Sequence, residues 1–309
     1  MNSPDTKQQF PARFLSLLAG LTMLTSTVIA QPVPISTDIP EGIDLTADLT
    51  YATYGDRMLM ADLYRPSGNS ESLPAIVMVR GGGWAVGDKE GYGPIAAALA
   101  LKGFVTASIE YRVSDEATFP AAVHDTKAAV RWLRSNAEEF NINPDAIGVI
   151  GGSAGAHLAA YLGVTAGIEE LEGEGGHGDA SSGVQAVVAL AAPSSLLPVG
   201  GCNQSSDDPE NAVVKFLGEG CSANDSLWAY ASPVTHVSAD SAPILMIHSE
   251  ADTVVNFTES LLLGMAYGEH NVPASIHLIP DAPHAFWNFN EWLQDTIDKA
   301  ADFFHHELQ

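Results

Sequence analysis

The segment Gly151-Gly152-Ser153-Ala154-Gly155 places a hydroxyl nucleophile between glycines. A short apolar stretch, residues 146–150, comes before it, and a helix is predicted over residues 156–164. A strand that turns directly into a helix strains the backbone of the residue at the turn, and glycines give that turn room. The hydroxyl then lies beside the positive N-terminal end of the helix. The pattern predicts that Ser153 is a nucleophile for acyl transfer; the alternative is a structural turn serine.

A nucleophilic serine needs a base, and the base needs an acid that fixes its tautomer. In one widespread strand–helix architecture the chain order is serine, acid, histidine, with the last two on loops after late strands. Asp252 follows a predicted strand, 99 residues after Ser153 and 32 residues before His284, which follows the next predicted strand. We therefore predict Asp252 as the acid and His284 as the base.

Other acidic and histidine side chains compete for these two roles. Glu250 lies closer to the end of its strand and is the alternative acid. His248, at the strand end, is expected to pack beneath the loop, and His157, one helical turn after the serine, is expected to be structural. His305 and His306 lie in the predicted terminal helix, far from any catalytic loop.

A third element is the segment Arg80-Gly81-Gly82-Gly83-Trp84, directly after a predicted strand. Because glycines have no side chain to block approach, the backbone N–H groups of Gly82 and Gly83, together with that of Ala154, can form an oxyanion hole. The alternative is a phosphate-binding loop. The segment lacks the G-x-x-x-x-G-K-S/T pattern of such loops, so the oxyanion hole is the better interpretation.

Two tryptophans flank the predicted catalytic loops. Trp84 and Trp287 either line the substrate site or simply pack, since large aromatic side chains in such places do both. Asp125 and Arg131 are expected to form a structural pair near the surface of a predicted helix, and they receive no catalytic role.

The elements that must position these residues alternate between strand and helix along the chain. This order predicts an α/β fold with a mostly parallel sheet and helices on both faces. The predicted strands cover residues 45–64 (an antiparallel pair), 74–80, 104–111, 146–150, 184–191, 243–248 and 274–279. The predicted helices cover residues 92–102, 121–140, 156–164 and 286–307. We expect a single domain over residues 31–309.

Residues 193–235 are too many for a plain connection between two elements. They contain two helical patches, near residues 211–217 and 226–231, and we predict a small lid inserted before the next strand. They also contain both cysteines of the chain, Cys202 and Cys221, each preceded by glycine. In an oxidising compartment this pair is expected to form a disulfide. Two cysteines without a nearby histidine pair supply too few ligands for a metal, so no metal site is predicted.

The charge balance is strongly acidic, with 13 basic and 38 acidic residues and a net charge of −25. Such a surface repels phosphate backbones and anionic lipids, so nucleic acids and anionic membranes are excluded as partners. It also disfavours anionic substrates and suits neutral ones. The simplest explanation of the acidity is solubility.

The first thirty residues have the pattern of a targeting segment. Lys7 and Arg13 precede an apolar run over residues 14–30, which ends in Val28-Ile29-Ala30, with small enough side chains for signal-peptidase cleavage. We predict a signal peptide over residues 1–30, cleavage near Ala30, and a secreted or periplasmic mature protein that does not enter a membrane. An uncleaved membrane anchor is the alternative.

These motifs together resemble the carboxylesterase families of the α/β-hydrolase fold that carry an H-G-G-G-W loop. The resemblance is strongest to the bifunctional feruloyl and acetyl-xylan esterase-like (BD-FAE) branch and the hormone-sensitive-lipase-like branch. It runs from about residue 45 to the C-terminus and also includes Gly87-Asp88-Lys89, Glu110-Tyr111-Arg112 and Ser232-Pro233-Val234-Thr235-His236. The resemblance implies an α/β-hydrolase fold and ester hydrolysis through an acyl-enzyme, without metal or organic cofactor. One departure is Arg80, which stands where the family usually has histidine.

We therefore expect an exported esterase for small acyl groups on a neutral substrate, with acetyl or feruloyl esters of plant polysaccharide as candidates. One alternative is a serine peptidase of the prolyl-oligopeptidase type. Such enzymes usually carry an N-terminal propeller, and the stretch between residue 31 and the first predicted strand is too short for one. The other alternative is a non-catalytic binding protein on a hydrolase scaffold, but Ser153, Asp252 and His284 are all present.

Overall fold

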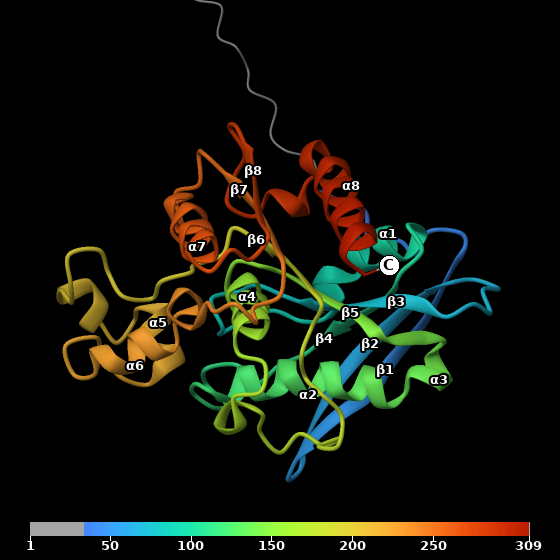
Figure 1. Cartoon of the computed structure of the whole chain (residues 1–309), viewed down its shortest axis with the longest axis horizontal. Helices are drawn as coiled ribbons and strands as arrows, with labels where there is room; N and C mark the ends of the chain where they lie inside the picture. Colours follow the sequence, from blue (N-terminus) through green and yellow to red (C-terminus); the bar gives the residue numbers. More distant parts are fainter. Residues whose placement is uncertain (1–33, 309) are drawn as a thin grey trace, which may run out of the picture. The chain divides into compact units, whose positions relative to one another are not determined.

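The structure, a computed structural model, describes residues 34–308. The predicted signal peptide and its cleavage site near Ala30 lie outside the described residues. Eight strands within the described part form one sheet in the order β1-β2-β4-β3-β5-β6-β7-β8 (Figure 1). The strands are β1 Ile43–Tyr54, β2 Arg57–Pro66, β3 Leu73–Val79, β4 Val105–Ile109, β5 Ile142–Gly152, β6 Ala186–Leu190, β7 Ile244–Ser249 and β8 Ala274–Ile279.

The sheet is mostly parallel, as predicted. Strand β2 is antiparallel to both β1 and β4, and every other neighbouring pair is parallel. Strands β3 and β6 are almost continuous apolar runs, because helices cover both of their faces. In such a sheet the carboxyl ends of the parallel strands meet at one edge, where loops from distant parts of the sequence come together.

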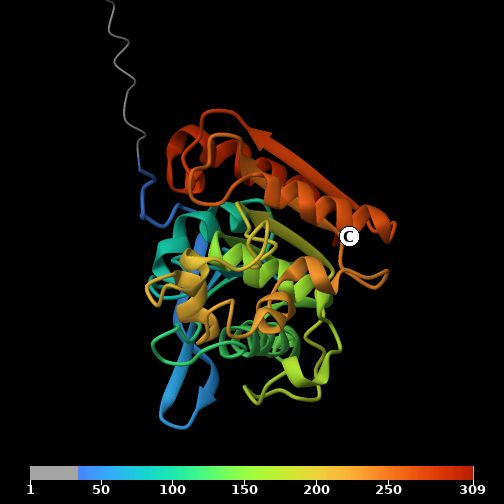
Figure 2. The same cartoon turned by 90° about the vertical axis from the view of Figure 1, so that its left-hand side faces the viewer.

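The helices form the outer layers on the two faces of the sheet (Figure 2). They are α1 Gly93–Leu101, α2 Ala121–Ser135, α3 Ala137–Phe140, α4 Ala154–Val164, α5 Ala212–Leu217, α6 Asp225–Tyr230, α7 Thr258–Glu269 and α8 Asn290–Glu307. Short 3₁₀ turns supplement them: η1 Glu90–Tyr92, η2 Glu169–Leu171, η3 Gln204–Asp207, η4 Pro233–His236 and η5 Phe286–Asn288.

Strand β3 illustrates how the core is divided between these layers. Val77 and Val79 belong to the apolar cluster under α2, α4 and α7. The alternate residues Ile76 and Met78 belong to a second cluster under α1 and α8. The period of two along a strand thus sends successive side chains into separate cores.

Two helices differ from the prediction. The predicted helix over residues 121–140 is interrupted at Asn136, whose side-chain amide donates to Trp132 O at 2.7 Å and divides it into α2 and α3. Helix α7 was not predicted. Its buried residues include Leu263 and Tyr267, but Leu261 is exposed, so the apolar residues do not form one stripe at helical spacing.

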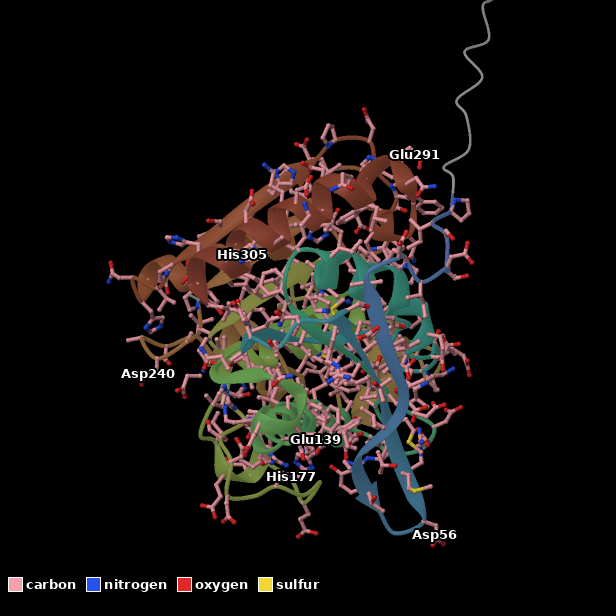
Figure 3. The ribbon with its side chains drawn as sticks, turned by 90° about the vertical axis from the view of Figure 1, so that its right-hand side faces the viewer. Asp56, Glu139, His177, Asp240, Glu291 and His305 are labelled. Atoms are coloured by element: carbon pink, nitrogen blue, oxygen red, sulfur yellow. A yellow bond between two sulfur atoms is a disulfide. The ribbon has the colours of Figure 1, made fainter. Side chains whose placement is uncertain are left out.

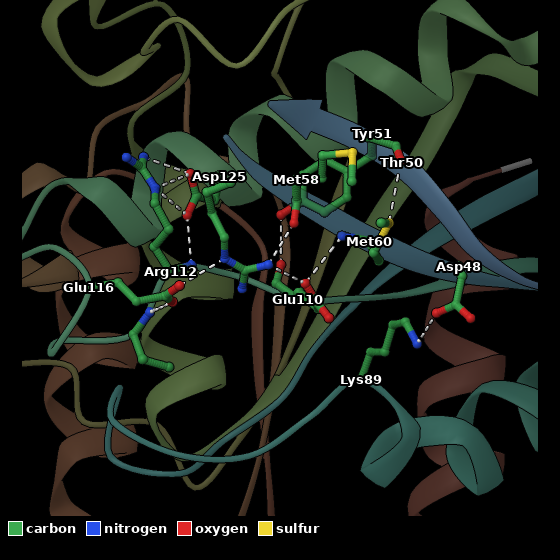
Figure 4. Close-up of polar contacts among 12 residues, drawn as sticks. Asp48, Thr50, Tyr51, Met58, Met60, Lys89, Glu110, Arg112, Glu116 and Asp125 are labelled. Atoms are coloured by element: carbon green, nitrogen blue, oxygen red, sulfur yellow. Dashed lines mark hydrogen bonds and ion pairs between the residues drawn. The ribbon is translucent and has the colours of Figure 1, made fainter. Parts of the chain in front are cut away.

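The expected Asp125–Arg131 pair was wrong. Asp125 is fully buried and accepts from Arg112, with an Nη2–Oδ1 distance of 2.7 Å (Figure 4). Arg131 instead pairs at 2.9 Å with Glu172, which directly follows η2. The two side chains therefore anchor different loops onto α2, because each one finds a closer partner of opposite charge.

The long connection between β6 and β7 contains the predicted helical patches as α5 and α6. The side chains of Asn211 and Asn224 cap the two helices by accepting from backbone N–H groups in the first turn. Cys202 and Cys221 form a disulfide with a Cα–Cα distance of 5.4 Å. The disulfide joins the segment before η3 to the segment after α5.

Candidate active site

Ser153 lies at the sharp turn between β5 and α4. Its backbone has φ 55° and ψ −123°, a conformation that non-glycine residues rarely adopt, and its N–H donates to Leu190 O at 2.8 Å. Side chains could not replace the flanking glycines, because a Cβ on Gly151 would overlap Gly155 O and a Cβ on Gly155 would overlap Val79 O. The predicted strained turn is present in the structure.

The structure brings the three predicted residues into one hydrogen-bonded chain. His284 Nε2 lies 2.8 Å from Ser153 Oγ, and His284 Nδ1 lies 2.6 Å from Asp252 Oδ2. A carboxylate can only accept, so Nδ1 carries the proton and the neutral Nε2 faces the serine hydroxyl as an acceptor. In this tautomer the histidine can remove the proton from the serine.

The loop after β7 holds the Asp252 carboxylate in place. Oδ1 accepts from the N–H groups of Val254 and Val255 at 2.8 and 2.9 Å, which leaves Oδ2 for His284. Asp252 is only 7% exposed. The alternative acid Glu250 is exposed, and it makes no hydrogen bond to His284 in the part of the chain that the structure describes.

The glycine-rich loop after β3 packs against the serine turn. A Cβ on Gly81 would lie 2.7 Å from Gly152 O, so only glycine allows this approach. Gly82 and Gly83 have φ values of 114° and 59°. Within residues 34–308 their N–H groups donate to no backbone carbonyl. The N–H of Ala154 is at the first position of α4 and has no intrahelical acceptor.

The far end of the same loop is fixed by a buried lysine. Lys89 Nζ lies 2.9 Å from Asp48 Oδ1 (Figure 4) and 3.1 Å from Asp62 Oδ1. Its backbone carbonyl accepts from Ser108 Oγ at 2.6 Å. These contacts attach the Gly87-Asp88-Lys89 motif to β1, β2 and β4, so both ends of the glycine loop are tied to the sheet.

A cavity of about 420 Å³ opens directly over Ser153 and His284. Its wall combines the glycine loop with the turn after β8. The lining residues are Arg80, Gly81, Gly82, Gly83, Gly87, Asp88, Gly91, Tyr92, Ser153, Val254, His284, Ala285, Trp287 and Asn288. Sequence reasoning missed Gly91, Tyr92, Val254 and Asn288. Asp88 and Arg80 stand in noted motifs but were given no lining role.

The two tryptophans have different positions. Trp287 lines the cavity, with its ring 5.9 Å from that of His284. Trp84 does not line it, contrary to one of the two expectations. It is 4% exposed, stacks on Phe216 at 4.7 Å and meets the edge of His157 at 5.2 Å. Its positive φ of 58° turns the side chain into the core, so Trp84 is a packing residue.

The insertion at residues 193–235 contributes no residue to the cavity wall. Through Phe216 it packs behind the glycine loop instead, on the side where Trp84 is buried. The insertion also approaches Gly83, which lines the cavity, since a Cβ on Gly83 would lie 3.6 Å from Ala212 Cβ. The lid stays a prediction.

The remaining histidines of the site region are buried and bonded. His157 Nε2 lies 2.8 Å from Ala231 O, and burial lowers the pKa of His157 to about 4, so the ring is neutral. Burial also lowers the pKa of His248, which lies beneath the loop that carries Asp252. Both placements match the structural roles expected from the sequence.

Residues 34–308 hold no group of three histidine, cysteine, aspartate or glutamate side chains arranged to bind a metal ion. In the same part of the chain, no helix has the length and apolar character needed to cross a membrane.

Comparison with known proteins gives one family match. The profile of the BD-FAE family matches residues 61–266, which is more than half of the 309 residues. Esterase LipQ of Mycobacterium tuberculosis is 28% identical over 250 residues, covering 78% of this chain and 57% of its own length. The chain spans about half the length of the curated relatives it matches.

Solved structures extend the likeness over most of the chain. A truncated carbohydrate esterase from gut microbiota has a TM-score of 0.76 and 28% identity, covering 85% of this chain and 96% of its own. The thermophilic esterase Est2 of Thermogutta terrifontis has a TM-score of 0.72 and 26% identity, covering 86% of this chain and 92% of its own. Both support an α/β-hydrolase fold with esterase relatives.

Proposed function

The chain belongs to the BD-FAE family of α/β-hydrolases, and from that premise we propose that it is a serine carboxylic-ester hydrolase that acts through an acyl-enzyme. The observation that carries the proposal is the hydrogen-bonded chain from Asp252 through His284 to Ser153. Beside it, the glycine loop lines the same cavity. A nucleophile, a base of defined tautomer and donors for an oxyanion are the parts that acyl transfer requires.

In the first half-reaction Ser153 Oγ attacks the ester carbonyl carbon while His284 Nε2 takes the hydroxyl proton. The N–H groups of Gly82, Gly83 and Ala154 hold the negative oxygen of the tetrahedral intermediate, and Asp252 stabilises the imidazolium. The intermediate collapses when the bond to the alcohol oxygen breaks and His284 gives that oxygen the proton. The alcohol leaves and the acyl group stays on Ser153.

In the second half-reaction water replaces the alcohol. His284 removes a proton from the water as it attacks the acyl carbonyl, and a second tetrahedral intermediate forms in the same hole. The bond to Ser153 Oγ then breaks, His284 returns the proton to the serine, and the carboxylic acid departs. No further co-reactant is needed.

The cavity and the relatives support a small, neutral acyl ester. Esterase Est2 has been solved with butyrate and with propionate bound. Asp88 and Asn288 are exposed at the cavity wall beside Trp287. The exposed carboxylate and amide can hydrogen-bond to the hydroxyl groups of a sugar, which supports an ester carried on a polysaccharide. A similar solved protein is described as a carbohydrate esterase.

Export belongs to the same proposal. A leader that ends near Ala30 would release a mature protein into the periplasm or medium, and the Cys202–Cys221 disulfide is typical of such oxidising compartments. A polymeric substrate that cannot enter a cell fits an exported enzyme.

The test compares wild type, Ser153→Ala and a control, Ser70→Ala, whose side chain is exposed on the β2–β3 connection. The substrates are p-nitrophenyl acetate, butyrate and octanoate, acetylated xylan, methyl ferulate and a prolyl peptide. We expect kcat on short esters to fall by about 10⁴-fold or more in Ser153→Ala and to stay unchanged in Ser70→Ala.

Three outcomes would contradict the proposal. Wild-type turnover in Ser153→Ala would remove the serine mechanism. Cleavage of the prolyl peptide alone would favour the peptidase alternative. Wild-type protein that turns over no ester, yet binds xylan fragments, would favour a binding protein on a hydrolase scaffold.

A further inference from the structure

Arg80 is a buried cation without an acidic partner. It is 5% exposed, and none of the carboxylates that the structure describes lies within ion-pair distance of it. Its Nη1 contacts neutral oxygens: Gly81 O at 3.2 Å, Val86 O, and Tyr111 OH at 3.5 Å. The guanidinium also lies 4.3 Å from the centre of the Tyr111 ring.

A buried charge of this kind is costly unless its surroundings compensate it. Here the compensation comes from carbonyl dipoles and an aromatic face, which leave the net charge in place. The chain is rich in acidic residues, yet none of those within residues 34–308 is paired with Arg80. The charge of Arg80 therefore remains unpaired at the wall of the cavity, which it lines together with Ser153 and the exposed Asp88.

The guanidinium also ties together the two ends of the glycine loop. Gly81 O precedes the Gly82–Gly83 pair and Val86 O follows it, and Nη1 is within hydrogen-bond distance of both. In a planar trans peptide the C=O and the following N–H point in opposite directions. Because Gly81 O faces Arg80, the N–H of Gly82 points away from Arg80.

Gly87 leaves the space that the guanidinium occupies. A Cβ on Gly87 would lie 2.9 Å from Arg80 Nη1, and its φ of 110° suits glycine. The motif Gly87-Asp88-Lys89 is thus linked to Arg80 at one end and to the sheet through Lys89 at the other. The loop geometry depends on the arginine side chain fitting against this glycine.

We propose that Arg80 is a positioning residue that orients the Gly81–Gly82 peptide and places a permanent positive charge behind the oxyanion hole. This rests on the proposed function. A histidine at this position would be largely uncharged at neutral pH, whereas an arginine stays charged. The charge favours the anionic tetrahedral intermediate over the neutral ester, so its contribution appears in kcat and in the binding of anionic analogues.

The experiment separates charge from hydrogen bonding with three variants. Arg80→Lys keeps the charge but loses the planar fork, Arg80→Gln keeps a neutral donor, and Arg80→His introduces the residue usual in the family. The matched control is Arg134→Gln. Arg134 also binds carbonyls, those of Pro144 and Gly183 at 2.8 and 2.9 Å, but it does not line the cavity.

Three quantities are measured on each variant: kcat and KM for p-nitrophenyl butyrate, Ki for butylboronic acid, and Ki for butyramide. The boronic acid forms an anionic tetrahedral adduct with a nucleophilic serine, whereas butyramide is a neutral ground-state analogue. Thermal unfolding monitors folding. We expect Arg80→Gln to lower kcat and weaken the boronic acid about 10- to 100-fold, with KM and butyramide affinity nearly unchanged. Both Arg80→Lys and the control Arg134→Gln should retain more affinity for the boronic acid than Arg80→Gln does.

Wild-type kcat and boronic acid affinity in Arg80→Gln would overturn the proposal. So would an equal loss of boronic acid and butyramide affinity, because a merely structural role weakens both. If Arg80→Gln fails to fold, Arg80→His carries the same comparison with a ring that is largely neutral above pH 7.5. Failure of the proposed function is distinguishable, since it would appear in the wild type as absent ester turnover and absent boronic acid binding.

Discussion

Two histidines share one oxygen of Asp252. His284 Nδ1 lies 2.6 Å from Oδ2, and His248 Nε2 lies 3.4 Å from the same atom. His248 Nε2 also lies 2.9 Å from Val255 O, which can only accept, so Nε2 carries the proton. Its Nδ1 then accepts from Ser260 Oγ at 2.8 Å. His248 thereby holds the turn whose N–H groups bind the other carboxylate oxygen.

Replacing His248 with leucine is expected to reduce both stability and turnover. It leaves Val255 O and Ser260 OH without their partner, which should lower the unfolding free energy by about 1–3 kcal/mol for each buried group. It also frees the turn that orients Asp252, and we expect kcat/KM for p-nitrophenyl butyrate to fall about 10-fold or more. Urea unfolding and steady-state kinetics measure the two effects.

The control for this prediction is Ser260→Ala, which removes only the outer hydrogen bond of the ring. It should lower stability less and leave kcat/KM within about twofold of wild type. A His248→Leu variant with wild-type kinetics would show that Val254 and Val255 hold the carboxylate without help.

At the residue scale, what the sequence predicts well is chemistry carried by residue type and chain order. Ser153, Asp252 and His284 were identified because each follows a predicted strand in the expected order. The double contact of His248 and the neutral surroundings of Arg80 depend on how the loops after β7 and β3 fold back on these side chains, which residue type and chain order do not predict. The sequence could not decide whether Trp84 lines the site or packs, because its role depends on the ring of Phe216 and on one positive φ value.

At the scale of elements, the insertion between β6 and β7 supports the catalytic region from behind. The Phe216 ring of α5 stacks on Trp84 in the glycine loop. Its carbonyl accepts from Phe119 N at 2.7 Å, and Ala231 O, after α6, is bonded to His157 of α4. Figure 1 shows α5 and α6 on the side of α4. The insertion thus contacts both the glycine loop and the helix that begins after Ser153.

We expect Phe216→Ala to lower kcat more than it changes KM, because the space left beside Trp84 loosens the loop that carries Gly83. Phe216 is 1% exposed, so the truncation should cost about 3–5 kcal/mol of unfolding free energy. Kinetics at a temperature where the variant is fully folded, together with urea unfolding, test this.

Phe304→Ala is the matched control, since Phe304 is also fully buried but lies in the apolar cluster under α1 and α8. It should lose similar stability and retain kcat. An equal fall of kcat in both variants would mean that general loosening, and not the contact with Trp84, affects turnover.

The order of the elements could be predicted because buried parallel strands are short apolar runs bounded by turn residues. The bounds of the largely exposed edge strand β8 were also predicted to the residue. Helix α7 was missed because exposed apolar residues on it, including Met265, mask the stripe. The insertion's helices were predicted, but their packing behind the loop was not, because it depends on long-range contacts that leave no local pattern.

At the scale of the whole molecule, acidity and buried histidines act on stability in opposite directions as the pH falls. The net charge is −25 at pH 7, and acidic side chains such as Asp56, Glu139 and Asp240 (labelled in Figure 3) are exposed. Protonation relieves their mutual repulsion. Burial lowers the pKa values of His124, His157 and His248, so protonation of these rings opposes folding.

His157 isolates the second effect. Its pKa is about 4 in the folded protein against 6.5 for an ordinary histidine, so between these values the unfolded chain binds a proton that the folded chain does not. Stability therefore falls as the pH drops from 6.5 towards 4, by up to about 3 kcal/mol from this residue.

In His157→Gln, which keeps a donor for Ala231 O, that share of the pH dependence should vanish. Urea unfolding of both proteins at pH 7, 6, 5 and 4.5 measures it. At each lower pH, the difference in unfolding free energy between wild type and variant should shift in favour of the variant. If the two plots of unfolding free energy against pH were parallel, the ring would be protonated in the folded state without cost.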